Sequence, residues 1–427
     1  MRGKISLPGD KSIAHRAVIL SALAQGKTAV KNIPLSEDCL ATVDVLSKLG
    51  IKIILNRASC QATVFGRGLF GLNKPKGALF IKESGTTFRL LLGVLAGQKF
   101  KTKLNAGKSL SHRPMLRVIK PLRLMGGAIK SKRINKEEYA PLAITGAGLT
   151  GITYRLPVAS AQVKSALLLA GLSGRGETKI IEPIKTRDHT ERMLKLFKAA
   201  LRVRGNAITI KGGKELTSPR ILYIPGDISS AAFFMVGANI IPDSKVLIKN
   251  AGFNPGRMGV IKALNKMGAR VKIKKLKFSN CGNEPMGDIL AGSSSLRGIR
   301  IKENEIPSLI DELPILMVAA CLAKGKSVFE NTGELRAKET DRIKSMLVNL
   351  TKMGAKIKVV KSRGRESIII KGVKELRGAE VSSFGDHRTA MSMLIAGLAA
   401  KGPTRIDDIS CINKSFPDFL KTLNSLT

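Results

Sequence analysis

The 427-residue sequence contains no tryptophan, only 4% aromatic residues and only four histidines. Few aromatic side chains are therefore available to stack on nucleic-acid bases, and a histidine-rich metal centre is not expected. The five cysteines follow neither the spacing of a zinc site nor that of a disulfide framework; they are Cys39, Cys60, Cys281, Cys321 and Cys411. We predict that the protein holds neither a metal nor structural disulfides.

Long hydrophobic runs are also missing. No run approaches the roughly 20 residues that a membrane-spanning helix needs, and the opening MRGKISLPGD lacks the charged-then-apolar pattern of a signal peptide. We expect a cytoplasmic protein that does not act in a membrane. With 44% hydrophobic residues the chain can bury a sizeable core, and its length predicts about two domains.

Acidic residues are scarce, with 31 Asp and Glu against 73 Lys and Arg, which gives a net charge of +42. Such an excess attracts nucleic acid, anionic membranes or polyanionic small substrates. The lysines are spread along the whole chain instead of forming one basic arm. We therefore interpret most of them as a solvated surface and expect no dedicated nucleic-acid partner.

An internal repeat organises the sequence. A helix-like apolar run ends in a glycine-containing turn and passes into a basic, strand-like segment six times, at Leu23, Leu95, Leu172, Val236, Leu322 and Leu398. These positions differ by 72, 77, 64, 86 and 76 residues, which predicts a unit of roughly seventy residues.

A second pattern lies between these turns, in LSKLGIKI, LRLMGGAI, LNKMGARV and LTKMGAKI. Each segment is typical of a helix that closes on a glycine with positive φ and continues into a strand. Because helices and strands alternate along the chain, we predict an α/β fold.

A polar turn precedes each of the six repeated helices: GDKSIAHR, ESGTTFR, ASAQVKS, GDISSA, PSLIDE and FGDHR. Structurally, such turns are helix N-caps. Functionally, helix N-termini bind anions, so six of them facing a common space would hold phosphates and carboxylates. Lys11, Arg16 and Arg388 favour the functional interpretation. A nucleotide-binding phosphate loop is excluded because Asp10 precedes Lys11 where that motif needs glycine.

These turns and several other segments resemble the 5-enolpyruvylshikimate-3-phosphate synthase family, in the same order along nearly the whole chain: LPGDKSIAHRA, SGTTFRLL, HRPMLRVIKPL, ASAQVKSALLLAGL, TRDHTERML, GDISSAAFF, SLIDELPIL, ELRAKETDRI, FGDHRTAMSM and SFPDF. The resemblance implies a two-domain inside-out α/β barrel with three βαβαββ repeats per domain. It places one domain at residues 10–227 and the other at 228–427, completed by residues 1–9, with the active site in the cleft between them.

The resemblance also assigns site residues. Positions matching the binding of shikimate 3-phosphate are Lys11, Ser12, Arg16, Ser160, Ala161, Gln162, Arg187, Asp311 and Lys338. Positions matching the binding of phosphoenolpyruvate are Lys11, Gly85, Arg113, Gln162, Arg342, Arg388 and Lys414. Positions matching the reacting centre are Asp311, Lys338 and Glu339. The residues taken as catalytic are Asp311, Glu339 and Lys11.

The implied reaction transfers an enolpyruvyl group and needs a base at the 5-hydroxyl, an acid for the methylene carbon and dense positive charge. We expect Asp311 to be the base, whereas Glu339 and Lys11 both remain candidates for the proton donor. The scheme requires no metal or organic cofactor. The expected partners are small anionic substrates, and we expect a monomer.

The sequence departs from the family pattern in three places. Glu83 stands where asparagine is common, which puts a possible anion near the phosphoenolpyruvate side. Ala161 replaces a frequent serine, and the residues that usually add a strand before the first motif are missing, which leaves the edge of that sheet open to question.

Two alternatives share the fold. UDP-N-acetylglucosamine enolpyruvyl transferase usually has a cysteine in the region that corresponds to Lys101–Arg113, but this sequence has none between Cys60 and Cys281. A basic RNA-binding relative without enzymatic activity is the other alternative. Intact Asp311, Glu339 and Arg342 argue against it.

Overall fold

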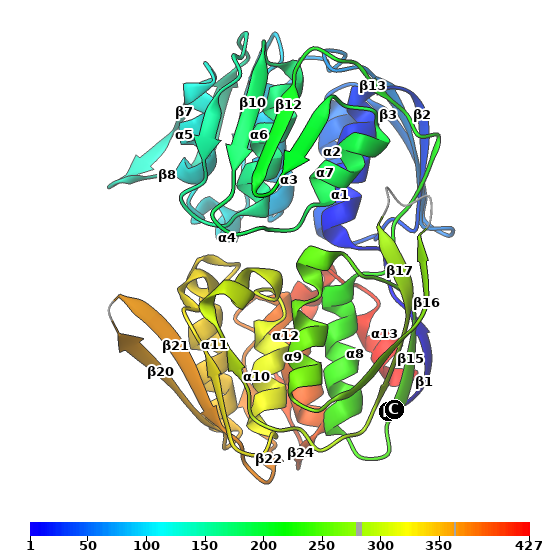
Figure 1. Ribbon diagram of the computed structural model, residues 1–427, viewed down its shortest axis with the longest axis vertical. Coiled ribbons are helices and arrows are strands. Elements are labelled where there is room, and N and C mark those ends of the chain that lie inside the picture. Colours follow the sequence, from blue (N-terminus) through cyan, green and yellow to red (C-terminus); the bar gives the residue numbers. More distant parts are fainter. Residues whose placement is uncertain (279–283, 363) are drawn as a thin grey trace. The chain divides into compact units, whose positions relative to one another are not determined.

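The computed structural model describes residues 1–278, 284–362 and 364–427, so Cys281 lies outside the described part (Figure 1). The chain forms two compact units. The N-terminal unit comprises Gly9–Pro225, together with Phe278 and Glu284. The C-terminal unit comprises Met1–Pro8, Gly226–Lys277 and Pro285–Thr427.

Three sheets belong to the N-terminal unit. In each, a central strand pairs in parallel with a short strand on one side and antiparallel with the second strand of a hairpin on the other. The first sheet has the order β13 (Leu216–Thr217), β2 (Ala24–Lys31), β4 (Gln61–Arg67), β3 (Lys52–Asn56), with β14 (Ile221–Tyr223) also on β2. The second has the order β5 (Leu79–Phe80), β6 (Lys101–Asn105), β8 (Glu137–Thr145), β7 (Ala128–Ile134). The third has the order β11 (Leu201–Arg204), β12 (Ala207–Lys211), β10 (Glu177–Ile181), β9 (Thr153–Arg155).

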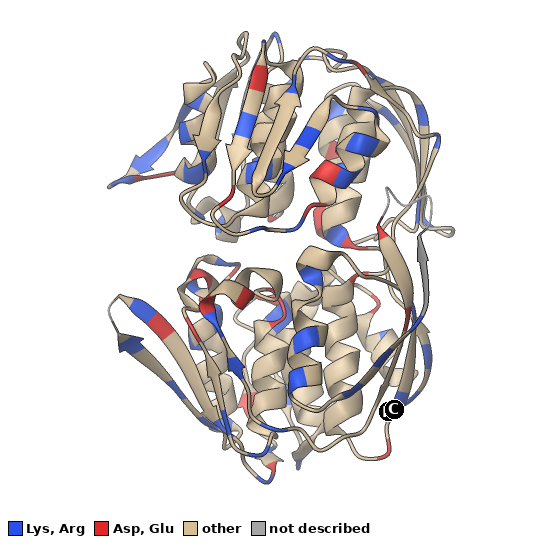
Figure 2. Cartoon of the chain, viewed as in Figure 1, with Lys and Arg blue, Asp and Glu red and all other residues tan. Residues whose placement is uncertain are grey.

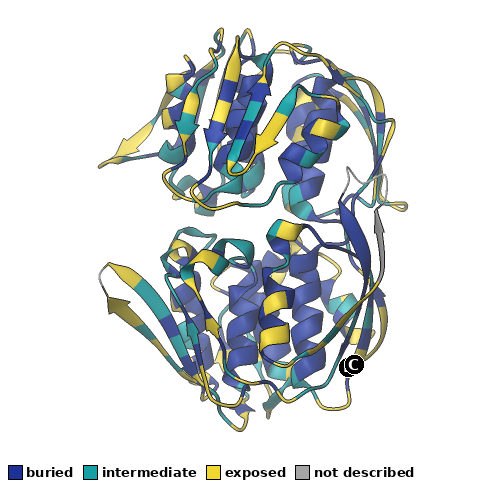
Figure 3. Ribbon diagram, viewed as in Figure 1, coloured by how far each residue is buried: buried dark blue, intermediate teal, exposed yellow. Residues whose placement is uncertain are grey.

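The helices of this unit lie inside its sheets (Figure 1). The three central helices are α1 (Lys11–Leu23), α3 (Gly85–Ala96) and α6 (Ala161–Ser173), and the others are α2 (Glu37–Lys48), α4 (Lys108–Ser111), α5 (Leu116–Leu124) and α7 (His189–Leu196). Nearly every residue of the central helices is buried (Figure 3). A helix that is apolar on all sides belongs in a core.

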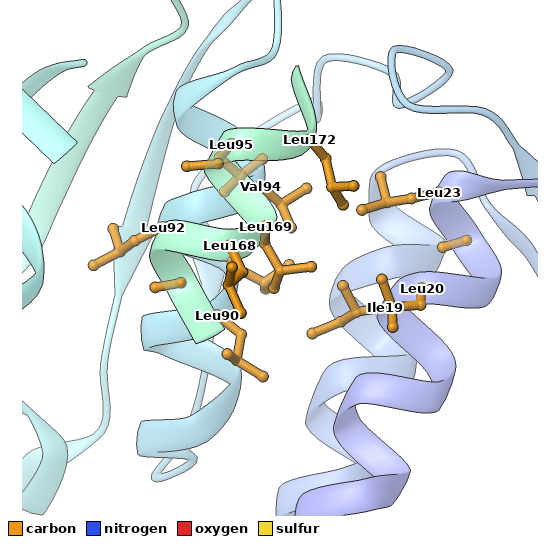
Figure 4. Packing of buried hydrophobic residues seen from close by; sticks show 14 of the residues in the cluster. Ile19, Leu20, Leu23, Leu90, Leu92, Val94, Leu95, Leu168, Leu169 and Leu172 are labelled. Carbon is orange, nitrogen blue, oxygen red and sulfur yellow. The ribbon is translucent and has the colours of Figure 1, made fainter. Parts of the chain in front are cut away.

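Leucine-rich faces fill the space between the three central helices. Leu20 of α1, Leu90 of α3 and Leu169 of α6 belong to one buried cluster (Figure 4). Helices α3 and α6 approach especially closely at Gly93, where an added Cβ would lie 2.0 Å from the carbonyl oxygen of Ala166. Only glycine fits there, so the spacing of these two helices depends on it.

The C-terminal unit has a similar strand order. Its first sheet runs β1 (Arg2–Ser6), β15 (Lys245–Gly252), β17 (Pro285–Gly292), β16 (Arg270–Phe278), and its second β18 (Arg300–Ile301), β19 (Lys326–Phe329), β21 (Arg365–Lys371), β20 (Lys356–Ser362). Two short parallel pairs follow, β22 (Leu376–Arg377) with β24 (Ala400–Lys401) and β23 (Glu380–Val381) with β25 (Arg405–Ile406). The edge strand β1 pairs with β15 over all five of its residues, so this sheet has a strand before the first motif, contrary to the expectation from the sequence.

Three buried helices also form the centre of this unit: α8 (Ile228–Ile240), α10 (Leu313–Cys321) and α12 (His387–Leu398). Around them lie α9 (Gly259–Lys266), α11 (Arg342–Lys352), α13 (Phe419–Asn424) and the 3₁₀ helices η1 (Pro255–Arg257), η2 (Glu303–Ser308), η3 (Gly333–Ala337) and η4 (Ser410–Lys414). Phe234 of α8 packs edge-to-face on Phe416 and at a tilt on Phe419, with ring centroids 6.2 and 5.4 Å away. Within the described part of the chain, no helix has the length and apolar character to cross a bilayer.

The predicted α/β class is confirmed. The four glycines that were expected to end helices all have positive φ and precede a strand: Gly50 (+88°), Gly126 (+98°), Gly268 (+80°) and Gly354 (+84°). A helix also follows each of the six polar turns. The basic residues lie on strands and helices of both units (Figure 2). The count of six repeats stays a prediction from the sequence.

Candidate active site

Five of the six polar turns cap their helices through a side chain, as the structural interpretation predicted. The cap bonds run to Asp10 from Ile13 N, to Ser84 from Thr87 N, to Ser160 from Val163 N, to Asp227 from Ser229 N, and to Asp386 from Arg388 N and Thr389 N. The sixth helix, α10, begins after Glu312, which makes no side-chain cap bond. Anion binding by these N-termini stays a prediction.

Helix α1 carries three predicted site residues on its first turns. Lys11 Nζ lies 2.9 Å from Asp38 Oδ2, and both side chains are about one-seventh exposed (15% and 13%). Arg16 donates from Nη1 to the carbonyl oxygen of Ser12 at 2.7 Å. Lys11, Ser12 and Arg16 are thus arranged on one end of one helix, with Lys11 reachable from solvent.

Arg16 is held from two other helices. Its Nε donates to Thr190 Oγ1 of α7 at 2.6 Å, and its Nη2 donates to Ser165 Oγ of α6 at 2.7 Å. The pKa of Arg16 is lowered to about 10, mainly by burial and also by the charge of Arg187, while the charges of Glu191 and Asp10 oppose this shift. Arg187 thus acts on Arg16 through its charge, and a shared anion for the two arginines stays a prediction.

The start of α6 is fixed by α3. Gln162 Oε1 accepts a hydrogen bond from Arg89 Nη1 at 2.5 Å, and Gln162 Nε2 donates to Thr86 Oγ1 at 3.0 Å. Ser160 caps the same helix, and the carbonyl oxygen of Ala161 accepts from Ser165 Oγ at 2.6 Å. Because both ends of its amide are engaged, Gln162 has a defined orientation.

Gly85, the first residue of α3, lies against Arg113. A Cβ at Gly85 would lie 2.6 Å from Arg113 Nη1 and 3.5 Å from Leu110 Cδ1. Because residue 85 has no side chain, the guanidinium of Arg113 can lie directly against the backbone there. These two predicted phosphoenolpyruvate positions are neighbours in the N-terminal unit.

Glu83 lies in the turn before α3 and binds the backbone of α4. Its carboxylate accepts hydrogen bonds from the backbone N–H groups of Ser109 (3.3 Å) and Leu110 (2.8 Å). These are amides in the first turn of α4. The carboxylate therefore binds the protein's own backbone. An anion at this position near the phosphoenolpyruvate side stays a prediction.

In the C-terminal unit, Arg342 connects three carboxylates. Its Nε donates to Asp386 Oδ2 at 2.9 Å, its Nη2 donates to Glu339 Oε2 at 2.5 Å, and its Nη1 lies 3.5 Å from Asp311 Oδ1. The Arg342 side chain is 1% exposed, whereas Asp311 and Glu339 are 18% and 25% exposed. The pKa of Arg342 is raised because the three carboxylates outweigh the effect of burial.

Two further cations lie beside Asp311. Arg388 Nη1 donates to the backbone carbonyl oxygen of Asp311 at 2.9 Å. Burial lowers the pKa of Lys338, while the charge of Asp311 raises it and that of Arg342 lowers it. Arg342 and Arg388 therefore both contact Asp311, and the charges of Asp311 and Arg342 act on Lys338. The roles of these residues toward the substrates stay a prediction.

Lys414 binds the turn before Arg388, and Glu312 directly follows Asp311. Lys414 Nζ donates to the carbonyl oxygen of Gly385 at 3.0 Å, in the turn that precedes Arg388. Glu312, which is 1% exposed, accepts from Ser229 Oγ and lies 3.6 Å from Arg257 Nη2. These buried contacts with Ser229 and Arg257 fix the position of Glu312, the residue directly after Asp311.

Sequence reasoning missed three residues that hold the predicted ones. Asp38 pairs with Lys11, Arg89 orients Gln162, and Asp386 binds Arg342. Asp386 and Arg89 lie inside the motifs FGDHR and ESGTTFR, so the motifs indicated that these residues belong to the site. The motifs did not indicate their partners, which are 44 and 73 residues away. Among the residues described, no three His, Cys, Asp or Glu side chains are grouped so as to hold a metal ion.

The predicted site residues of the N-terminal unit, around Lys11, and those of the C-terminal unit, around Arg342, form two residue sets. Each set combines cations with partly exposed carboxylates, which suits the binding of small anions and proton transfer to and from them. Known proteins point the same way. Residues 1–423 match the family described as EPSP synthase (3-phosphoshikimate 1-carboxyvinyltransferase). A protein named 3-phosphoshikimate 1-carboxyvinyltransferase from Syntrophomonas wolfei subsp. wolfei is 48% identical over 428 residues, covering 100% of this chain and 97% of the relative.

A protein of the same name from Geotalea daltonii is 46% identical over 427 residues, with 100% of this chain and 97% of that protein covered. The solved structure of EPSP synthase from Acinetobacter baumannii is 42% identical, with a TM-score of 0.86 and coverage of 100% of this chain and 95% of that one. That likeness extends the match from sequence to the whole fold. The chain therefore belongs to the EPSP synthase family.

Proposed function

We propose that the protein transfers the enolpyruvyl group of phosphoenolpyruvate to the 5-hydroxyl of shikimate 3-phosphate and releases phosphate, a step in the biosynthesis of chorismate and the aromatic amino acids. The observation that carries this proposal is the family match over residues 1–423. The match does not favour the nucleotide-sugar transferase or the RNA-binding alternative. The two residue sets lie on different units, and we assign both to this one reaction.

Asp311 is the proposed base. Its side chain is 18% exposed, so a substrate hydroxyl can reach it, and Arg342 Nη1 lies 3.5 Å from Oδ1. Arg388 fixes the backbone of the same residue. The carboxylate takes the proton of the 5-hydroxyl while the hydroxyl oxygen forms its bond to C2 of phosphoenolpyruvate.

The methylene carbon of phosphoenolpyruvate gains a proton in the same step and becomes a methyl group. Glu339, bound to Arg342 Nη2 at 2.5 Å, and Lys11, bound to Asp38 at 2.9 Å, are the two proposed donors. Both side chains are partly exposed. The intermediate then loses a proton from the methyl group, the bond from C2 to the phosphate oxygen breaks, and the enolpyruvyl ether and phosphate are the products.

Positive charge stabilises the anionic intermediate. We assign to shikimate 3-phosphate the residues Lys11, Ser12, Arg16, Ser160, Ala161, Gln162, Arg187, Asp311 and Lys338. We assign to phosphoenolpyruvate the residues Lys11, Gly85, Arg113, Gln162, Arg342, Arg388 and Lys414. Arginine suits these roles because its planar guanidinium binds carboxylate and phosphate in a bidentate fashion. Oriented donors stabilise developing charge without reorganising during the reaction.

The scheme uses only proton transfer and charge stabilisation, so we assign no cofactor. We place the protein in the cytoplasm as a monomer that acts on small anionic substrates. Light scattering across the working concentration range tests the monomer, and a mass twice that of the 45.8 kDa chain would contradict it.

A phosphate-release assay tests the proposed function. Release should require phosphoenolpyruvate and shikimate 3-phosphate together, and omission of either should abolish it. UDP-N-acetylglucosamine in place of shikimate 3-phosphate should give no release; release with it would favour the nucleotide-sugar alternative. Salt-dependent retention on RNA, combined with no release from the two substrates, would favour the RNA-binding alternative.

A further inference from the structure

We propose that Glu83 is a positioning residue that sets the place of Arg113, and through it the affinity for phosphoenolpyruvate. The inference rests on the proposed function for the role of Arg113, but its structural part stands on contacts within the N-terminal unit alone. Glu83 lies in the turn before α3, and Arg113 lies after α4.

The carboxylate of Glu83 joins these two segments. Oε1 accepts from the N–H of Ser109 at 3.3 Å, and Oε2 accepts from the N–H of Leu110 at 2.8 Å. The first amides of a helix have no partner inside the helix, so a carboxylate beside them satisfies donors that would otherwise face water. Glu83 thereby ties α4 to the start of α3.

The backbone brings the carboxylate to this position. Ile81 N donates to Asn105 O at 2.9 Å and Gly107 N donates to Lys82 O at 2.6 Å, so the two segments run side by side. Lys82 has a φ of +54°, a left-handed conformation that turns the chain toward Glu83. A Cβ at Gly107 would lie 2.3 Å from Glu83 Oε1, so glycine allows the close approach.

Arg113 follows directly from the tied residues. Its N–H donates to Leu110 O at 3.0 Å, and Leu110 is the residue whose N–H Glu83 holds. Beyond Arg113, Arg89 Nη2 donates to Pro114 O at 3.3 Å. The segment is therefore held on both sides of Arg113, by Glu83 before it and by Arg89 after it, and its guanidinium comes to lie over Gly85.

The contact depends on a carboxylate. Two oxygens accept from two amides, whereas the amide of a glutamine has one accepting oxygen and would turn its NH₂ group toward the second backbone N–H. Asparagine, common in the family at this position, is also one methylene shorter. Glu83→Gln preserves the size of the side chain and removes only the second acceptor, so it is the most informative variant. Glu83→Ala removes both acceptors.

Two measurements on the full chain test the proposal. Hydrogen exchange followed by mass spectrometry reports on residues 107–113, where both variants should speed exchange by about tenfold or more. Steady-state kinetics should show KM for phosphoenolpyruvate raised by about fivefold or more, with KM for shikimate 3-phosphate within about twofold of the wild type. Glu375→Ala, which removes an exposed carboxylate of the C-terminal unit, is the control and should change neither.

A double-mutant cycle separates positioning from a general structural effect. In an Arg113→Ala background, Glu83→Gln should still speed exchange but should raise KM for phosphoenolpyruvate no further. Unchanged exchange in Glu83→Ala, an equal rise of both KM values, or full additivity with Arg113→Ala would each overturn the proposal. If the wild type releases no phosphate, the proposed function fails, and the exchange of residues 107–113 still decides whether Glu83 holds this segment.

Discussion

Asp386 binds Arg342 with one carboxylate oxygen and caps helix α12 with the other. Oδ2 accepts from Arg342 Nε at 2.9 Å, and Oδ1 accepts from Arg388 N at 2.7 Å. The Asp386 side chain is 0% exposed. One buried carboxylate thus fixes two arginines that we assign to phosphoenolpyruvate.

Asp386→Asn keeps an oxygen for the helix cap but removes the charge that faces Arg342. Removing one partner of a buried ion pair leaves the other uncompensated, and Glu339 and Asp311 compensate only in part. We expect the free energy of unfolding to fall by about 2–4 kcal/mol and KM for phosphoenolpyruvate to rise by about tenfold or more. Urea unfolding and steady-state kinetics measure both.

Asp418→Asn is the control for this change, because Asp418 is exposed and makes no side-chain cap bond to α13. Asp418→Asn should leave the free energy of unfolding and KM for phosphoenolpyruvate near their wild-type values. An Asp386→Asn protein with unchanged stability and unchanged KM would show that the pairing with Arg342 carries little free energy.

Asp311→Asn tests the proposed base. Arg388 can still bind the backbone carbonyl of residue 311, so substrate affinity should stay within about tenfold, whereas loss of a general base should lower turnover by about two orders of magnitude or more. Rapid-quench kinetics with saturating substrates measure the chemical step. Near-normal turnover in a folded variant would remove Asp311 from the mechanism.

Gly93→Ala tests the packing of α3 on α6. Inside a helix, alanine is ordinarily more favourable than glycine by about 1 kcal/mol, but here its Cβ would lie 2.0 Å from the carbonyl oxygen of Ala166. We expect destabilisation of about 1–3 kcal/mol, the usual range for overpacking. Gly77→Ala is the matched control, because nothing lies within 4 Å of its added Cβ. Equal urea midpoints for the two variants would show that the helices can separate at little cost.

Glu138 links stability to pH. Hydrogen bonds from Arg123, at 2.6 and 2.8 Å, lower the pKa of the Glu138 carboxyl below its ordinary value of 4.5, assisted by Ser131 and opposed by burial. Since the folded state lowers this pKa, the carboxylate stabilises the fold above pH 4.5, and this contribution is lost as pH falls through the folded-state pKa.

Glu138→Gln should therefore be less stable than the wild type by about 1–3 kcal/mol at pH 7, and the difference should shrink below pH 4.5. Urea unfolding at several pH values measures it. Glu137→Gln, one residue away, should change stability by no more than about 0.5 kcal/mol. A difference for Glu138→Gln that stays constant down to pH 3 would exclude the ion pair with Arg123 as its cause.

Local features of the fold could be predicted from the sequence because they depend on neighbouring residues. The glycines at 50, 126, 268 and 354 end helices as expected, since a left-handed residue after an apolar helical run is a local signal. The polar turns lie at helix starts for the same reason. Strand β1, by contrast, finds its partner β15 more than 230 residues away, and no local pattern specified that pairing.

The site residues were placed by their resemblance to a family, but their partners were not. Arg342 and Asp386 are 44 residues apart, and nothing near either residue indicates the other. Glu83 shows the limit most clearly, because its carboxylate binds two backbone amides 26 and 27 residues further along, and its sequence context does not indicate these partners. Such contacts depend on how distant segments pack.

The most direct measurement is the fate of the methylene carbon of phosphoenolpyruvate. With ¹³C at that carbon and with shikimate 3-phosphate present, NMR of the reaction should show the label as a vinyl methylene of an enolpyruvyl ether, formed in equal amount to phosphate. Label that appears instead as the methyl group of pyruvate would mean that the protein hydrolyses phosphoenolpyruvate, and label that stays in phosphoenolpyruvate would mean no reaction. Either result would contradict enolpyruvyl transfer.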